Sequence, residues 1–120
     1  MEGQAVQVET ITPILRVKDM AVSKAFYIDV LGFADAWGDD NFGAISRDGR
    51  SIYLSKEDQG DPGSCWVWIG LEDLDMFYEA CKASGAEMRQ EPTNHPWAYE
   101  MQVADPDGHV LRIATGPRED

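Results

Sequence analysis

The sequence has few basic residues, only two cysteines and two histidines, and no long apolar run. Its 22 aspartates and glutamates outnumber its 10 lysines and arginines, which gives a formal net charge of −12. Such a surface repels a phosphate backbone, which argues against nucleic acid as a partner. No apolar run reaches the roughly 18 residues that a membrane span needs. Residues 1–10 also lack the basic-then-apolar order of a secretory signal. We therefore expect a cytoplasmic protein with no membrane partner.

The two cysteines, Cys65 and Cys81, are predicted to be buried thiols rather than a disulfide. Cys81 falls on the apolar stripe of a predicted helix, and the chain has the features of a cytoplasmic protein. The acidic excess would concentrate a cationic ligand near the surface if a suitable pocket exists. By itself, the excess only keeps the protein soluble.

Two halves of the chain carry the same order of structural signals. The first has a strand over residues 10–17, a helix, and three short strands near 33–38, 42–47 and 51–55. The second has a strand over 65–71, a helix, and strands near 86–90, 99–104 and 109–114. A polar linker, 56–64, joins them. We predict one domain over residues 1–120, with an α+β fold and an internal repeat of about 10–55 and 65–114 around a shared cleft.

Local signals fix the ends of these elements. Asp19 and Asp73 are good helix N-caps, and Gly32 and Gly85 suit the left-handed residue that follows a helix. Apolar spacing predicts that Val22, Phe26 and Val30 form the buried stripe of the first helix, and Leu74, Phe77, Tyr78 and Cys81 that of the second.

Turn signals complete the outline. Asp48-Gly49 predicts a two-residue hairpin turn. Pro13 interrupts the first strand's hydrogen-bonding capacity and therefore places that strand at an edge or a bend. Glu91 to Pro96 is predicted to be a loop, and His109 a solvated turn residue.

Several short motifs resemble those of a known family. Phe26-Tyr27 with Leu31-Gly32-Phe33, and Asp105-Pro106-Asp107-Gly108, are similar to signatures of the vicinal oxygen chelate superfamily. That superfamily includes glyoxalase I, extradiol dioxygenases, fosfomycin-resistance enzymes and bleomycin-resistance proteins. Thr12-Pro13-Ile14-Leu15, Trp66-Val67-Trp68 and Pro96-Trp97 most resemble the bleomycin-resistance proteins. The resemblance runs from about residue 10 to 114.

The resemblance implies paired βαβββ modules with curved mixed sheets, in a homodimer. In bleomycin-resistance proteins the first strand is exchanged between subunits at a proline hinge, and Pro13 matches that proline. Two crevices between the subunits then bind the drug without altering it. The alternative for Pro13 is that it only ends an edge strand.

The resemblance also locates the positions at which related enzymes hold a metal ion. In those enzymes His, Gln or Glu side chains converge from four matched strand positions. Here those positions carry Thr12, Tyr53, Trp66 and Arg112. A hydroxyl, a phenol, an indole and a permanent cation do not make such a site, so we expect no metal and no cofactor.

Aromatic side chains take the place of metal ligands in the predicted cleft. Flat rings at this density suit a planar heteroaromatic group, with a cation–π contribution if that group is charged. Matching to bleomycin-resistance proteins implies aromatic contacts from Trp37, Phe42 and Trp97 and a polar contact from Ser55. The remaining candidate contacts are Asp39 and Asp40, for a cationic tail, and Trp66, Trp68 and His95.

Each of these residues has a structural alternative. Large aromatics on short strands most often belong to the core, and either Trp66 or Trp68 could be a core residue. His95 is equally compatible with an exposed loop. Trp97 lies in a proline-flanked loop where packing demands little of it, so it is the firmest candidate.

Three functional hypotheses follow. The first is a metal-free dimer that sequesters a cationic aromatic antibiotic of the bleomycin type. The second is an enzyme of the same superfamily, a lyase, an isomerase or a dioxygenase-like protein, acting on an unknown small molecule. Its candidate groups are His95, Tyr53, Tyr99 and Glu100. The third is a domain that acts only by association with a partner.

Overall fold

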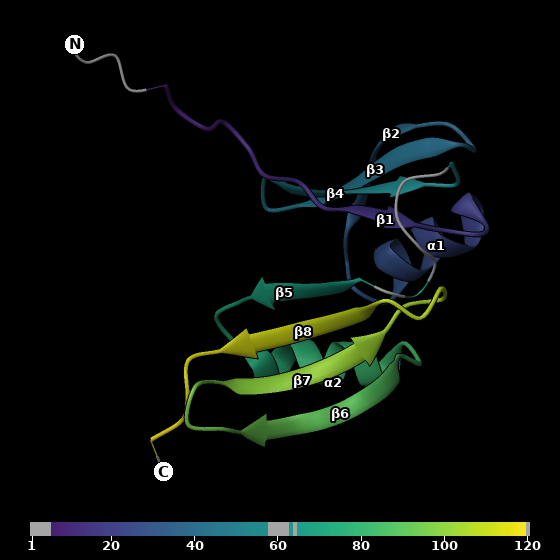
Figure 1. Ribbon diagram of the computed structural model, residues 1–120. Helices are drawn as coiled ribbons and strands as arrows, with labels where there is room; N and C mark the ends of the chain where they lie inside the picture. The colour runs from purple at the N-terminus through teal and green to yellow at the C-terminus, as the bar shows by residue number, and fades with distance from the viewer. Residues whose placement is uncertain (1–5, 58–62, 64, 120) are drawn as a thin grey trace.

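The computed structural model describes residues 6–57, 63 and 65–119. The first module consists of β1 (Ile14–Arg16), α1 (Met20–Asp29), β2 (Ala34–Gly38), β3 (Phe42–Arg47) and β4 (Arg50–Ser55). The second consists of β5 (Trp66–Gly70), α2 (Leu74–Ala83), β6 (Glu87–Asn94), β7 (Tyr99–Ala104) and β8 (Val110–Thr115) (Figure 1). The predicted linker, 56–64, lies largely outside the described residues.

Each module forms its own four-stranded mixed sheet. The strand orders are β1-β4-β3-β2 and β5-β8-β7-β6. The first strand of each module pairs in parallel with the last, and the other pairings are antiparallel. The predicted α+β fold with two βαβββ modules is confirmed. None of the described helices is long and apolar enough to cross a membrane.

Helix caps and turns lie where the sequence places them. Asp19 accepts a hydrogen bond from the Val22 amide at 3.1 Å, and Asp73 accepts one from Met76 at 3.0 Å. Between β3 and β4, Asp48 and Gly49 have φ angles of 51° and 78°. Two successive positive φ angles allow the tight turn that joins a twisted hairpin.

The buried stripe of α1 differs from the prediction. Met20, Ser23 and Tyr27 are buried, whereas Val22 is exposed, and Phe26 only packs against the core's edge. The spacing rule selected apolar residues only. It missed Ser23 and Tyr27, whose polar ends reach carboxylates of the other module.

Two element boundaries also differ from the prediction. The first strand covers Ile14–Arg16 rather than 10–17, because residues 10–13 are not paired as a strand; the N-terminal end of the described segment leads away from the first sheet (Figure 1). β6 extends to Asn94, so most of the segment predicted to be a loop is strand. Thr93 and Asn94 pair with Glu100 and Tyr99, and this pairing overrides the local turn signals.

The two modules join where α1 meets the turn between β7 and β8. The Tyr27 hydroxyl donates to Asp105 Oδ2 at 2.8 Å, and the Ser23 hydroxyl donates to Asp107 Oδ2 at 2.9 Å. Burial raises the pKa of Asp105, and burial together with the Asp105 charge raises that of Tyr27. The Asp-Pro-Asp-Gly motif of the second module is therefore hydrogen-bonded to α1 of the first.

His109 is part of the same junction, and its prediction as a solvated turn residue is wrong. The side chain is fully buried. Its Nε2 lies 2.7 Å from the carbonyl oxygen of Arg16, and its Nδ1 accepts from the Cys65 amide at 3.2 Å. Because a carbonyl only accepts, Nε2 carries the proton, and the neutral ring bridges β1 and the start of β5.

Candidate functional site

Each sheet buries one face against the core and leaves the other open. On β5, Val67 and Ile69 pack against the core, whereas Trp66 and Trp68 point to the other side. On β3 and β4, the buried Ile45 and Leu54 alternate with Phe42 and Tyr53 in the same way. We call the helix-free surface of the first module's sheet the first open face, and that of the second module's sheet the second open face.

All four tryptophans of the chain are largely exposed. Their exposed fractions are 48% for Trp37, 54% for Trp66, 51% for Trp68 and 61% for Trp97. Tryptophan is normally well covered in a folded protein, so four such rings indicate surfaces suited to a partner molecule. Neither Trp66 nor Trp68 is a core residue.

Three rings cluster on the first open face. The centroid of Trp37 lies 5.9 Å from that of Phe42 and 5.0 Å from that of Tyr53, and Phe42 and Tyr53 are 5.6 Å apart. Trp37 joins this cluster because the register shifts between Asp35 and Trp37, which sets Trp37 opposite Ala44. Without that bulge, strand alternation would place Trp37 on the same side as Asp35.

The acidic turn beside this cluster is ordered by Asp39. Its Oδ1 accepts hydrogen bonds from the Asn41 amide at 2.8 Å and the Phe42 amide at 3.1 Å. These two donors lower the pKa of Asp39. Asp39 and Asp40 are both exposed in the turn that joins Trp37 on β2 to Phe42 on β3; their predicted role toward a cation stays a prediction.

Ser55, the expected polar contact, pairs with Phe42 across the sheet but is fully buried. Its hydroxyl accepts a hydrogen bond from the Glu57 amide at 3.1 Å. Ser55 therefore supports the start of the next segment and does not present its hydroxyl to the surface in this conformation.

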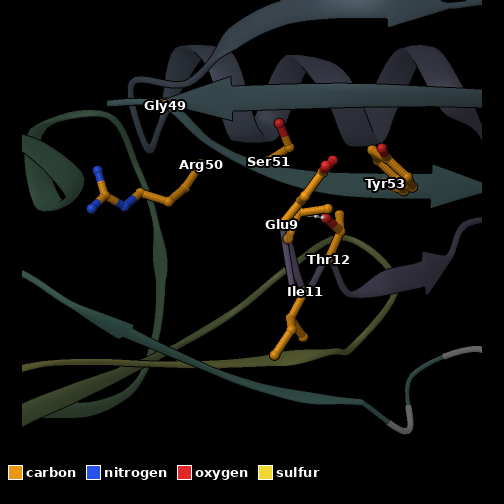
Figure 2. A pocket seen from close by; sticks show the side chains of 8 residues that line it. Glu9, Ile11, Thr12, Gly49, Arg50, Ser51 and Tyr53 are labelled. Atoms are coloured by element: carbon orange, nitrogen blue, oxygen red, sulfur yellow. Dashed lines mark hydrogen bonds between the residues drawn. The ribbon is translucent and has the colours of Figure 1, made fainter. Parts of the chain in front are cut away.

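A cavity of about 530 Å³ lies between the N-terminal segment and the β3–β4 hairpin (Figure 2). Residues 9–12 line one side, and Gly49, Arg50, Ser51 and Tyr53 line the other. Figure 2 shows the side chains of Glu9, Thr12, Ser51 and Tyr53 around this space. Thr12 and Tyr53, two of the positions matched to metal ligands, thus border one cavity.

On the second open face, Arg112 lies over Trp68. The guanidinium carbon is 5.1 Å from the ring centroid, and Nε and Nη2 bind Glu100 at 2.8 and 2.7 Å. Glu100 is only 1% exposed, so its charge needs this partner. The hydrogen bond from Arg112 is the main reason that the pKa of Glu100 falls to about 2.

Trp97 and His95 extend this arrangement. Trp97 donates its indole N–H to Glu100 Oε1 at 3.0 Å, and the His95 ring stacks on Trp97 with centroids 4.5 Å apart and planes 3° apart. Both residues belong to the β6–β7 turn, closed by a 2.8 Å bond from the His95 amide to the Ala98 carbonyl. A shallow depression of about 420 Å³ is lined by Trp68 and Trp97 together with residues of the neighbouring strand ends.

A second arginine on this face was not predicted. The guanidinium carbon of Arg89 lies 4.9 Å from the Trp66 ring centroid, and its Nη1 donates to Gln102 Oε1 at 2.8 Å. The register of β6 shifts between Met88 and Gln90. Simple alternation along the sequence therefore could not assign Arg89 to a face.

The donor set does not fit a metal ion of the family type. Arg112 is engaged by Glu100, Trp66 is covered by Arg89, and Tyr53 is packed among rings. No group of three or more His, Cys, Asp or Glu side chains that could hold a metal occurs in the part of the chain that the structure describes. We therefore derive no step that involves a metal.

The candidate groups for catalysis have structural contacts. Glu100, with a pKa of about 2, is a weak base, and its oxygens are bound by Arg112 and Trp97. The Tyr99 hydroxyl donates to Asp75 at 2.5 Å, and the His95 ring stacks on Trp97. These contacts fix side chains in place; they do not join the candidates into an acid–base pair.

Within one chain, the two open faces are separate surfaces. Among the described residues, no Cα atom of a first-sheet strand lies within 8 Å of a Cα atom of a second-sheet strand. Trp37 and Phe42 are thus together, and Trp68, His95 and Trp97 are together, but the two groups do not meet.

Residues 7–113 match the family model described as "Glyoxalase/Bleomycin resistance protein/Dioxygenase superfamily". Among solved structures, TnmS3, an antibiotic-binding protein from Streptomyces sp. CB03234, is 25% identical, with a TM-score of 0.76 over 97% of this chain and 98% of its own. No curated protein matches the sequence.

More distant structures share the fold. Virulence protein STM3117 from Salmonella typhimurium is 18% identical, with a TM-score of 0.77 over 93% of this chain and 99% of its own. A glyoxalase/bleomycin resistance protein/dioxygenase from Nocardioides is 20% identical, with a TM-score of 0.75 over 97% and 89%. The family match covers most of the sequence, and the chain belongs to the glyoxalase/bleomycin resistance protein/dioxygenase superfamily.

Proposed function

We propose that this protein is a metal-free homodimer that sequesters a cationic aromatic antibiotic of the bleomycin type. The observation that carries the proposal is the exposure of all four tryptophans on the helix-free faces of the two sheets. Ring stacking gives affinity without chemistry, and sequestration requires affinity alone.

Two further observations support this function. The acidic residues Asp39 and Asp40 stand beside the ring cluster of Trp37 and Phe42, and the whole chain carries a net charge of −12. Both features attract a cationic aromatic molecule. The similarity to TnmS3 adds that a fold of this kind, at 25% identity, occurs in an antibiotic-binding protein.

A second copy of the chain would complete the site. The described N-terminal segment extends beyond the first sheet (Figure 1), and Val6, Val8 and Ile11 are exposed along it. We propose that this segment crosses to the partner with Pro13 as its hinge, so that the first open face of one subunit lies opposite the second open face of the other. A ligand would then be held between two ring-bearing surfaces.

Intrinsic fluorescence tests ligand binding directly, because every tryptophan lies on an open face. Titration with metal-free and with copper-loaded bleomycin should give saturable quenching at micromolar drug, corrected with a free tryptophan analogue. Trp97→Leu should weaken binding, whereas Val22→Ala, an exposed change on α1, should not. Absence of quenching would reject bleomycin as the ligand.

Two measurements test the remaining parts of the proposal. Analytical ultracentrifugation of the full chain should show a dimer, and deletion of residues 1–12 should shift it toward monomer. A monomeric full chain would reject the shared crevice. Elemental analysis of protein purified without chelators should find no stoichiometric zinc, nickel, iron or manganese; a stoichiometric metal would favour the enzyme hypothesis.

A further inference from the structure

The second open face differs in chemistry from the first. Each tryptophan of β5 has a guanidinium group stacked on its ring, with Arg89 over Trp66 at 4.9 Å and Arg112 over Trp68 at 5.1 Å. The first open face instead has rings that pack on one another, beside the exposed carboxylates of Asp39 and Asp40. A ligand that approaches the second face therefore meets guanidinium groups as well as indoles.

The contacts of each guanidinium group leave N–H donors that can bind a ligand. Arg112 binds Glu100 through Nε and Nη2, its side chain is 34% exposed, and Nη1 takes no part in that bidentate pair. Arg89 is exposed and binds the neutral Gln102 through Nη1. Among the described ion pairs, a carboxylate neutralises Arg112 but not Arg89.

Contacts with neighbouring side chains orient both guanidinium groups. Glu100 is almost fully buried and also accepts the Trp97 indole N–H, so it locks the plane of Arg112. The Trp66 ring and Gln102 constrain Arg89 from two sides. A guanidinium group stacks on an aromatic ring and donates hydrogen bonds in its own plane. Donors held over indole rings in this way suit a planar ring that carries a hydrogen-bond acceptor.

We propose that the second open face binds the planar aromatic part of the ligand through an anionic substituent on the ring, such as a carboxylate or phenolate. This inference rests on the proposed function and specifies its ligand further. The ligand then carries opposite charges on two of its parts. Its acceptor-bearing ring lies on Arg89 and Arg112, and its cationic group lies at Asp39 and Asp40. Guanidiniums repel a cation, so the opposite orientation is disfavoured.

Two naphthalene probes of opposite charge test the inference: 2-naphthoate and 2-naphthylmethylammonium. Affinities are measured by calorimetry on the full-length protein at pH 7, and the indole N–H signals of the four tryptophans are followed by NMR. Naphthoate should shift the Trp66 and Trp68 signals, and the ammonium probe should shift that of Trp37.

Matched variants on the two faces give the decisive comparison. Arg89→Leu should weaken naphthoate by about tenfold, the loss expected for one charge-assisted hydrogen bond, and should leave the ammonium probe unchanged. Asp39→Asn should weaken only the ammonium probe. Both residues are exposed, so neither substitution should affect folding. Circular dichroism of each variant checks that the fold is retained.

The outcomes separate the two proposals. If the ammonium probe binds and naphthoate does not, or if Arg89→Leu leaves naphthoate affinity within twofold, the anionic preference is wrong while aromatic binding stands. If neither probe binds nor shifts any indole signal, both proposals are overturned.

Discussion

Trp97 donates its indole N–H to Glu100 Oε1 at 3.0 Å, and Glu100 is the carboxylate that holds Arg112 over Trp68. A ring on the β6–β7 turn and a ring on β5 are thereby joined through one buried ion pair. The same two rings line the depression on this face. Trp97 is consequently held by a hydrogen bond, and Trp68 lies against the guanidinium group that the same carboxylate binds.

Replacing Trp97 tests this link. Trp97→Phe keeps a ring for His95 but removes the N–H donor, and Trp97→Leu removes both. We expect both variants to lose about 1 kcal/mol of unfolding free energy, measured in urea, because one hydrogen bond to Glu100 is lost. Ligand affinity should fall further in Trp97→Leu than in Trp97→Phe; equal affinities would show that the ring makes no contact with the ligand.

The Arg112–Glu100 pair makes stability depend on pH. The pKa of Glu100 falls from 4.5 to about 2 in the folded protein, mainly through Arg112. A lowered folded-state pKa gives a contribution that is complete above pH 4.5 and is lost as the pH falls toward 2. The shift corresponds to roughly 3 kcal/mol at neutral pH as an upper value.

The measurement compares urea unfolding of the wild type and Glu100→Gln at pH 7, 4.5 and 3. The wild type should be more stable at pH 7, and its advantage should shrink at pH 3. Using the difference between the two proteins removes the acid effects that other carboxylates share. An advantage that stays constant across this range would contradict the assigned role of the pair.

The junction between the modules depends on the hydroxyl of Tyr27. Tyr27→Phe removes the donor to Asp105 and leaves a buried carboxylate with one partner fewer, at a cost of about 1–3 kcal/mol. Tyr53→Phe is the matched control, since Tyr53 is only half-buried and belongs to the ring cluster. Its unfolding free energy should change by less than about 0.5 kcal/mol in the same urea titration.

Local chemistry made much of the fold predictable. Asp19 and Asp73 cap their helices, and Asp48-Gly49 forms the hairpin turn, because each of these residues satisfies a backbone requirement of its immediate neighbours. The repetition of such signals in the two halves predicted the paired modules. The family resemblance then predicted that aromatic residues border a ligand-binding cleft.

Features that depend on distant residues were not predictable. The bulge before Trp37 and those in β6 change which face a side chain occupies, and no local signal marks them. His109 follows a turn glycine and therefore has the sequence context of an exposed residue. Its burial depends on the carbonyl of Arg16, which lies in the other module.

Thiol reactivity tests the packing of α2 against its sheet. Cys81 is fully buried, and burial raises its pKa to about 11, whereas Cys65 is half-buried at the start of β5. Because the thiolate is the reactive form, Cys81 should resist an aromatic disulfide reagent at pH 8 until the protein unfolds. Cys65→Ser isolates Cys81: this variant should release no thiol chromophore when native and one equivalent in urea. Rapid reaction of native Cys65→Ser would mean that α2 opens readily, and the core beneath the second open face would then be less rigid than its contacts imply.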